Sequence, residues 1–143
     1  MSAPNSFEDI SDNLTFLDDW EDRYKYLIEL GGMLDPLPAS QRTEANKVHG
    51  CVSNVWLVSR TVQGDGKVKM EFEGDSDAMI VKGLVAVLIA YYSGRDAQWI
   101  AETDAVEMFD RLGLREHLTS QRSNGLKAMV ERIRREAAAC QQD

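Results

Sequence analysis

Two cysteines and two histidines are the side chains of this sequence best suited to nucleophilic or metal chemistry. Cys51 stands between two strand-like segments, and Cys140 lies near the end of the sequence. Gly50 tolerates backbone angles that other residues avoid, so the chain can turn sharply just before the Cys51 sulfur. A thiol on such a turn can face outward and react, because loops held by a rigid scaffold often carry reactive groups. Cysteine is also a common core residue, and these residues alone leave both interpretations open.

The candidate ligands and bases are too scattered to favour metal chemistry. A structural zinc site needs four ligands, commonly in paired spacings, and Cys51, Cys140, His49 and His117 form no such pair. The sequence therefore predicts no bound metal, and it contains no motif for another cofactor. Gly64-Asp65-Gly66 lacks the lysine of a phosphate-binding loop. A Cys–His hydrolase with His49 or His117 as base remains an alternative, although no nucleophile signature surrounds Cys51.

Arg122 is the charged residue whose position is least expected. It falls in or just before the first turn of the last predicted helix, where a positive charge opposes the helix dipole. A guanidinium beside a helix N-terminus makes an anion site, and a thiolate or persulfide is a suitable anion. A surface arginine paired with a carboxylate explains the position equally well. Arg132, Arg134 and Arg135 near the other end of this helix are expected to be solvated.

Composition indicates one folded domain over residues 1–143. The chain is 43% hydrophobic with a formal charge of −8, so nucleic-acid binding is not expected. The N-terminus shows no secretory signal, and the longest apolar run, Leu84 to Tyr92, is far shorter than the ~20 residues of a membrane helix. We therefore expect a soluble, cytoplasmic protein that makes no membrane contact. The first few residues and residues 138–143 are expected to be frayed.

Periodicity predicts an α+β fold. Two helices come first, one from Phe7 capped by Ser6 and one from Asp18 or Asp19 to about Gly32. Strands are predicted at 47–49, as a short edge strand, and at 54–62 and 67–73, which form a hairpin. A nearly all-apolar helix capped by Asp75 or Ser76 then runs to about Tyr92 and is expected to be buried. Shorter helices are predicted around Trp99 and at 104–112, and the last helix begins near Thr119 or Ser120.

Several motifs together resemble one known family. The runs WEDRYKYLIELG (20–31), HGCVSNVW (49–56), GDSDAMIVKGL (74–84) and HLTSQRSNGL (117–126) are similar in order and spacing to those of SufE proteins. The likeness covers about residues 20–137. It implies an α+β fold, with a small antiparallel sheet of about three strands and helices packed on it, similar to the IscU scaffold. SufE proteins accept sulfur from a pyridoxal-phosphate cysteine desulfurase of the SufS type.

The resemblance also implies roles for individual residues. Cys51 matches the sulfur-accepting cysteine, and Asp77 and Arg122 match residues of the family's active region. The chain would carry persulfide sulfur towards iron–sulfur cluster assembly and stimulate the desulfurase, without cofactor or independent turnover. A CsdA-type desulfurase as partner, or a binding module that activates without transfer, remains an alternative. Monomer and homodimer are both open, and His49 and His117 receive no role.

A persulfide needs protection from solvent, because exposed low-pKa sulfur is easily oxidised. We therefore expect Cys51 in the free protein to be mostly buried in an apolar pocket, with Val52, Val55 and Trp56 beside it. Docking of the desulfurase would then draw the loop outward.

Overall fold

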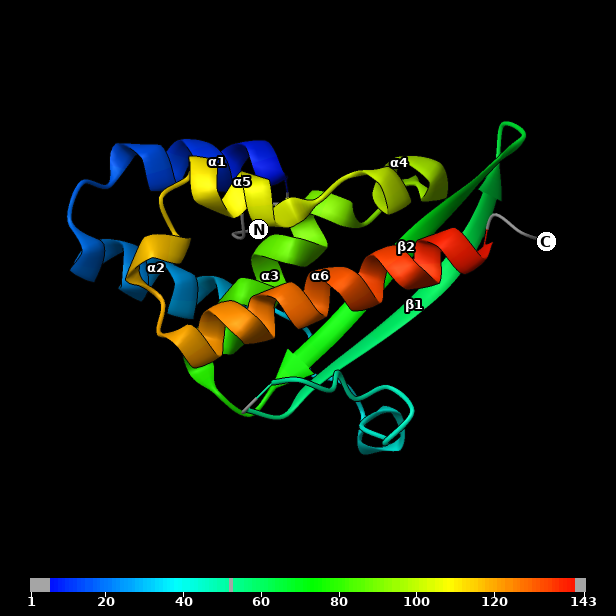
Figure 1. Cartoon of the computed structure of the whole chain (residues 1–143), viewed down its shortest axis with the longest axis horizontal. Coiled ribbons are helices and arrows are strands. Elements are labelled where there is room, and N and C mark those ends of the chain that lie inside the picture. The colour runs from blue at the N-terminus through cyan, green and yellow to red at the C-terminus, as the bar shows by residue number, and fades with distance from the viewer. Residues whose placement is uncertain (1–5, 52, 141–143) are drawn as a thin grey trace.

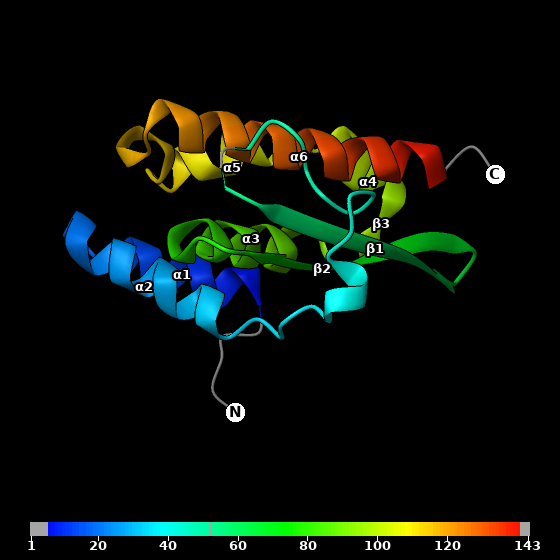
Figure 2. The ribbon, with the colours of Figure 1, turned by 90° about the horizontal axis from the view of Figure 1, so that it is seen from below.

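A three-stranded antiparallel sheet and six α-helices make up the part of the chain that the computed structural model describes, residues 6–51 and 53–140. The strands are β1 (Val55–Gly64), β2 (Lys67–Ser76) and β3 (Arg95–Asp96), in the order β1-β2-β3 (Figure 1). Figure 2 shows three levels, with α6 (Ser120–Cys140) and α5 (Ala105–Arg111) on one side. The central level holds α3 (Met79–Tyr92) and the hairpin, and α1 (Phe7–Phe16) and α2 (Trp20–Gly32) lie on the opposite side. The fold is α+β, as predicted.

The β1–β2 hairpin follows directly from its sequence pattern. Asp65 and Gly66 form the two-residue connection, and both have positive φ angles, 52° and 76°. Such a turn matches the twist of the two strands that it joins. Val55 and Leu57 on β1 and Met70 and Phe72 on β2 are buried. The predicted strands are confirmed, but β2 continues three residues further than expected, to Ser76, with Val55 paired to Ser76.

The third strand lies elsewhere than the sequence suggested. Of the segment predicted as an edge strand, Lys47 makes only an isolated bridge with Trp56. The third strand is instead β3, where Arg95 and Asp96 pair with Met70 and Lys69 of β2. A two-residue strand has no periodicity to detect. It exists because the chain leaving α3 turns at Gly94, whose φ is 84° and whose N–H donates to the carbonyl of Met70.

Helix α3 forms the centre of the core and packs closely on α2. Gly31 and Gly83 lie where the two helices meet, since a Cβ added to Gly83 would stand only 2.2 Å from the Leu27 carbonyl oxygen. The predicted cap of this helix was wrong, because α3 begins at Met79 after Ala78. Asp75 instead belongs to β2, is 3% exposed, and forms ion pairs with Arg42 and Lys82.

Two of the remaining helices begin where the sequence predicted, since Asp19 and Asp104 accept hydrogen bonds from the first turns of α2 and α5. Asp96, for which no cap was predicted, accepts one in the same way from the first turn of α4 (Ala97–Glu102). Helix α6 begins where expected, since the Arg122 backbone N–H donates to Thr119 Oγ1. It also continues through Cys140, so residues 138–140 are helical. Residues 1–5 and 141–143, which were also expected to be frayed, lie outside the described residues. Within residues 6–51 and 53–140, no helix combines the length and apolarity that a membrane crossing requires.

Candidate functional site

The loop that carries Cys51 is fixed at its upstream end. The backbone N–H of Val48 donates to the carbonyl of Val55 at 2.8 Å, so the chain folds back on the start of β1. From α6, Arg132 donates to the carbonyl oxygens of Lys47 and Ala45 at 2.8 and 2.9 Å. The expectation that Arg132 is merely solvated was therefore wrong. This arginine ties the segment before the loop to α6.

The downstream end of the loop is held by Asn54. The carboxylate of Asp77 accepts from the Asn54 backbone N–H at 3.1 Å and from its side-chain amide at 2.8 Å. In return, the Asn54 carbonyl accepts from Ser76 Oγ and from the Asp77 N–H. Asp77 lies before α3 and outside its first turn, so it does not serve that helix as an N-terminal acid. Its contacts instead make it a residue that positions the Cys51 loop.

Replacing Asp77 with alanine is expected to loosen this loop. The substitution removes two exposed hydrogen bonds, which together stabilise the closed loop by about 1 kcal/mol. Alkylation of Cys51 by iodoacetamide, followed by mass analysis, should become roughly threefold to tenfold faster, because the loop opens more often. Glu131→Ala on the exposed face of α6 removes the same charge and is the matched control. Equal rates in both variants would mean that Asp77 does not restrain the loop.

Between these two ends, Cys51 lies against the first turns of α6. Its thiol donates to the Gly125 carbonyl oxygen with an S···O distance of 3.5 Å, and the side chain is partly buried. Gly50 permits this approach, because its φ of 97° suits glycine and a Cβ on it would stand only 3.2 Å from the Cβ of Ala128. A Cβ on Gly125 would stand 3.4 Å from the Cys51 sulfur, at ordinary contact distance. The sharp turn expected at Gly50 is therefore present.

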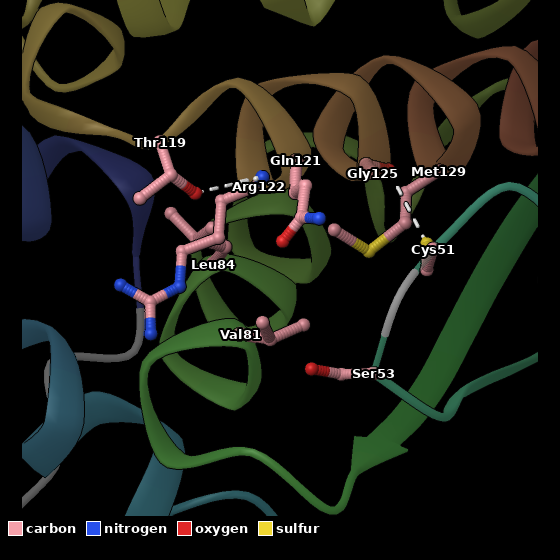
Figure 3. Close-up of a pocket in the computed structure, with 9 residues that line it drawn as sticks. All are labelled: Cys51, Ser53, Val81, Leu84, Thr119, Gln121, Arg122, Gly125 and Met129. Carbon is pink, nitrogen blue, oxygen red and sulfur yellow. Dashed lines mark hydrogen bonds between the residues drawn. The ribbon is translucent and has the colours of Figure 1, made fainter.

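Cys51 opens onto a cavity of about 260 Å³ between its loop, α3 and α6. Figure 3 shows Cys51 and Met129 at one end of this cavity and Arg122 at the other. Val81 and Leu84 of α3 contribute apolar side chains to the lining. The full lining comprises Cys51, Ser53, Val81, Leu84, Thr119, Gln121, Arg122, Gly125 and Met129. The described lining is thus part apolar and part polar, and Val52 lies outside the described residues.

The electrostatics of the site favour a neutral thiol in the free protein. Burial raises the pKa of Cys51 above its ordinary value, because the thiolate is less well solvated there. The Arg122 guanidinium does not offset this effect. It donates instead to the Tyr24 hydroxyl at 3.3 Å, from the opposite end of the cavity. Arg122 therefore does not lower the pKa of Cys51 in the free protein.

Neither histidine is placed as a base for Cys51. His49 lies 3.6 Å from the Glu44 carboxylate and is largely exposed, and His117 stacks on Trp20 at 4.4 Å. The hydrolase alternative thus lacks the nucleophile–base contact that it requires. Among residues 6–51 and 53–140, no group of three or more histidine, cysteine or acidic side chains is arranged around a possible metal position.

Sequence reasoning overlooked three residues that shape the site. Asn54 and Gly125 stand inside the motifs quoted above, where their positions could have been noticed. The sequence gave no indication that Arg132 contacts the segment before Cys51, because its partners are backbone carbonyl groups more than eighty residues away in the chain. Cys51 and Arg122 both line the cavity, whereas Asp77 holds Asn54 and is not among the described residues of the cavity wall.

The fold and the site define a class of small α+β proteins that present one partly buried thiol on a glycine-flanked loop. Residues 8–137 match the family model described as "SufE: Fe-S metabolism associated domain". The chain belongs to the SufE family, and its role accordingly lies in sulfur-related iron–sulfur metabolism.

Two curated relatives agree with this assignment, and one solved structure shares the fold. An uncharacterised SufE-like protein of Rhizobium etli is 57% identical over 92% of this chain and 89% of its own length. Another, of Rhizobium meliloti, is 50% identical over 92% of this chain and 94% of its own. The solution structure of a hypothetical protein from Thermus thermophilus shares the fold, with a TM-score of 0.72 and 22% identity. That alignment covers 99% of this chain and 100% of the other.

Proposed function

We propose that this protein accepts persulfide sulfur on Cys51 from a pyridoxal-phosphate cysteine desulfurase and passes it on for iron–sulfur cluster assembly. The observation that carries the proposal is the placement of Cys51. Its thiol lies on a loop held at both ends, partly buried beside a cavity that also contains a guanidinium. Membership of the SufE family supports the same assignment.

The transfer follows the chemistry of thiol–disulfide exchange. The desulfurase carries a persulfide on its own cysteine, and the Cys51 thiolate attacks the terminal sulfur. A new S–S bond forms on Cys51, the S–S bond on the desulfurase breaks, and its sulfur leaves as a thiolate. That thiolate takes up the proton that Cys51 has lost, so one sulfur atom moves without net oxidation. Removal of the persulfide frees the desulfurase for another turnover, which makes this protein both its co-substrate and its activator.

The resting environment of Cys51 suits a carrier that opens only when it docks. The thiol is partly rather than mostly buried, and its pKa is raised, so little thiolate exists near neutral pH in the free protein. Gly50 can change its backbone angles without a side-chain penalty, which makes it a hinge for the loop. A docked desulfurase would draw Cys51 away from Gly125 and towards solvent.

This opening is testable by chemical modification. Alkylation of Cys51 by iodoacetamide is expected to be slow in the isolated protein and at least about fivefold faster with a catalytically inactive desulfurase. A serine in place of the desulfurase's own active cysteine removes any competing transfer. Bovine serum albumin at the same concentration is the control for nonspecific crowding. A rate unchanged or lowered by the desulfurase would contradict the opening of the loop.

A non-catalytic activating module is the second candidate, and the raised pKa of Cys51 is the observation that favours it. Incubation of the protein with cysteine and a desulfurase, followed by mass analysis, distinguishes the activating module from a sulfur acceptor. Sulfur transfer predicts a Cys51-containing peptide heavier by one sulfur atom, and the mass returns to its original value after reduction. Stimulation of the desulfurase without this product would instead favour the activating module.

The identity of the partners follows from the same proposal. Either a SufS-type or a CsdA-type desulfurase could supply the sulfur, and running the mass experiment with both would identify the donor. An iron–sulfur scaffold complex is the proposed recipient. We also propose that the protein works in the cytoplasm, a reducing compartment in which protein thiols stay reduced. Its proposed oligomeric state is a monomer or a homodimer.

A further inference from the structure

The cavity beside Cys51 combines two chemically different ends. At one end are the Cys51 thiol and the Met129 side chain, and at the other is the Arg122 guanidinium, with Thr119 on its side and Gln121 between the two ends (Figure 3). No aspartate or glutamate is present among the described residues that line it. The chain as a whole has a charge of −8, so the cavity is a locally positive site on an acidic protein.

Arg122 and the contact point of Cys51 are close enough for one small molecule to reach both. Residues 122, 125 and 129 lie on one face of α6, since positions three and four apart are neighbours on a helix. Cys51 contacts Gly125, which stands about 4.5 Å along the helix axis from Arg122. The Arg122 side chain then extends away from Cys51 towards Tyr24, which leaves the cavity between them.

The size and wall of the cavity limit what it can hold. Its volume, about 260 Å³, lies just below the ~300–1,000 Å³ typical of pockets for drug-sized ligands. Val81, Leu84 and Met129 offer an apolar wall for a short carbon chain. Within the described residues, the Arg122 guanidinium has no carboxylate at ion-pair distance, and its polar contact is the neutral Tyr24 hydroxyl. A carboxylate would therefore complete its pairing.

We propose that this cavity binds small disulfides that carry a carboxylate, and that Cys51 forms mixed disulfides with them by exchange. The carboxylate pairs with Arg122, the short carbon chain lies against Val81 and Leu84, and the ligand's sulfur meets Cys51. This activity goes beyond transfer from a desulfurase, because it requires no protein partner.

The reaction is an exchange between one thiol and one disulfide. The Cys51 thiolate attacks one sulfur of the small disulfide, so a new S–S bond forms and the old one breaks. The other half leaves as a thiolate and takes up the proton lost by Cys51. The Cys51 sulfur is oxidised to the disulfide level and the departing half is reduced to a thiol. The mixed disulfide blocks sulfur acceptance until another thiol removes it, so the site responds to the pool of small disulfides.

Three disulfides with the same two-carbon spacer test the charge preference. They are 3,3′-dithiodipropionate, which is anionic, bis(2-hydroxyethyl) disulfide, which is neutral, and cystamine, which is cationic. The protein carries Cys140→Ser so that Cys51 is its only thiol. The rate of mixed-disulfide formation is measured by intact mass and divided by the rate of the same reagent with 2-mercaptoethanol. We expect the anionic disulfide to react about tenfold faster than the cationic one, the size of effect a nearby charge produces at a partly exposed site.

Substitution of Arg122 identifies the source of the preference. In Arg122→Gln the anionic advantage should disappear, and the overall charge of the chain should then favour cystamine. Arg135→Gln removes the same charge from the exposed part of α6 and should retain the wild-type order. Thermal unfolding of each variant establishes that the fold is unchanged.

Three results would overturn the proposal. In the first, the cationic disulfide reacts with the parent protein as fast as the anionic one. In the second, the anionic disulfide still reacts faster in Arg122→Gln. In the third, no reagent forms a mixed disulfide with Cys51. Because no desulfurase is present, these results are independent of the persulfide-transfer experiment. Failure of sulfur transfer from the desulfurase would likewise leave the preference for carboxylates standing.

Discussion

Replacing Cys51 with serine is expected to abolish sulfur acceptance and to remove stimulation of the desulfurase. A hydroxyl cannot form a persulfide, and its much higher pKa leaves no anion to attack the donor sulfur. The fold should survive, because serine is close to cysteine in size and can keep the hydrogen bond to the Gly125 carbonyl. We expect at least a hundredfold loss of stimulation, which corresponds to about 2.8 kcal/mol of activation free energy.

Cys140→Ser is the matched control for this substitution. Cys140 is the last described residue of α6 and is not among the residues that line the cavity. It should therefore retain full acceptance and stimulation, measured by peptide mass and by sulfide release from the desulfurase. Equal loss in the two variants would show that the thiols act as a pair. Full stimulation by Cys51→Ser without any acceptance would instead identify an activating module.

Gly83→Ala is expected to cause a large loss of stability, because the added Cβ has no space between α2 and α3. The added Cβ would lie 2.2 Å from the Leu27 carbonyl oxygen and 2.7 Å from the Leu27 carbonyl carbon, both backbone atoms of α2. Neither atom can move aside as a flexible side chain would, so α2 and α3 must separate. Overpacking of a core lowers the free energy of unfolding by about 1–3 kcal/mol and occasionally more. For this contact with backbone atoms we expect a loss of about 3 kcal/mol. Thermal unfolding should show a midpoint lower by roughly 10 °C.

Gly32→Ala provides a control for the change from glycine to alanine itself. Gly32 is the last residue of α2, is exposed, and has no atom within 4 Å of an added Cβ. This variant should be as stable as the parent, or more stable by up to about 1 kcal/mol, because alanine favours the helix. If both variants had the same melting temperature, close packing at Gly83 would not contribute to stability.

The sequence by itself determined the features that depend on neighbouring residues. Alternation of Val68, Met70 and Phe72 with charged residues predicted β2, and Asp65-Gly66 predicted the turn before it. The apolar run up to Tyr92 predicted a buried central helix. Four motifs in order and spacing also identified the family, and the one around Cys51 marked the residue that the site is built around. These predictions succeeded because strand alternation, helix periodicity and turn chemistry are local properties of the chain.

Only the tertiary structure decided the features that depend on distant partners. β3 is a strand because Arg95 and Asp96 meet β2, and its two residues carry no pattern of their own. Asp75 is a buried ion-pair partner rather than a cap, because β2 runs on past Glu73. The Cys51 thiol meets Gly125 from 74 residues away, and that contact buries the sulfur and raises its pKa. The burial of Cys51 depends on how α3, α6 and the loop pack together. The direction of its pKa shift could therefore be determined only from the folded chain.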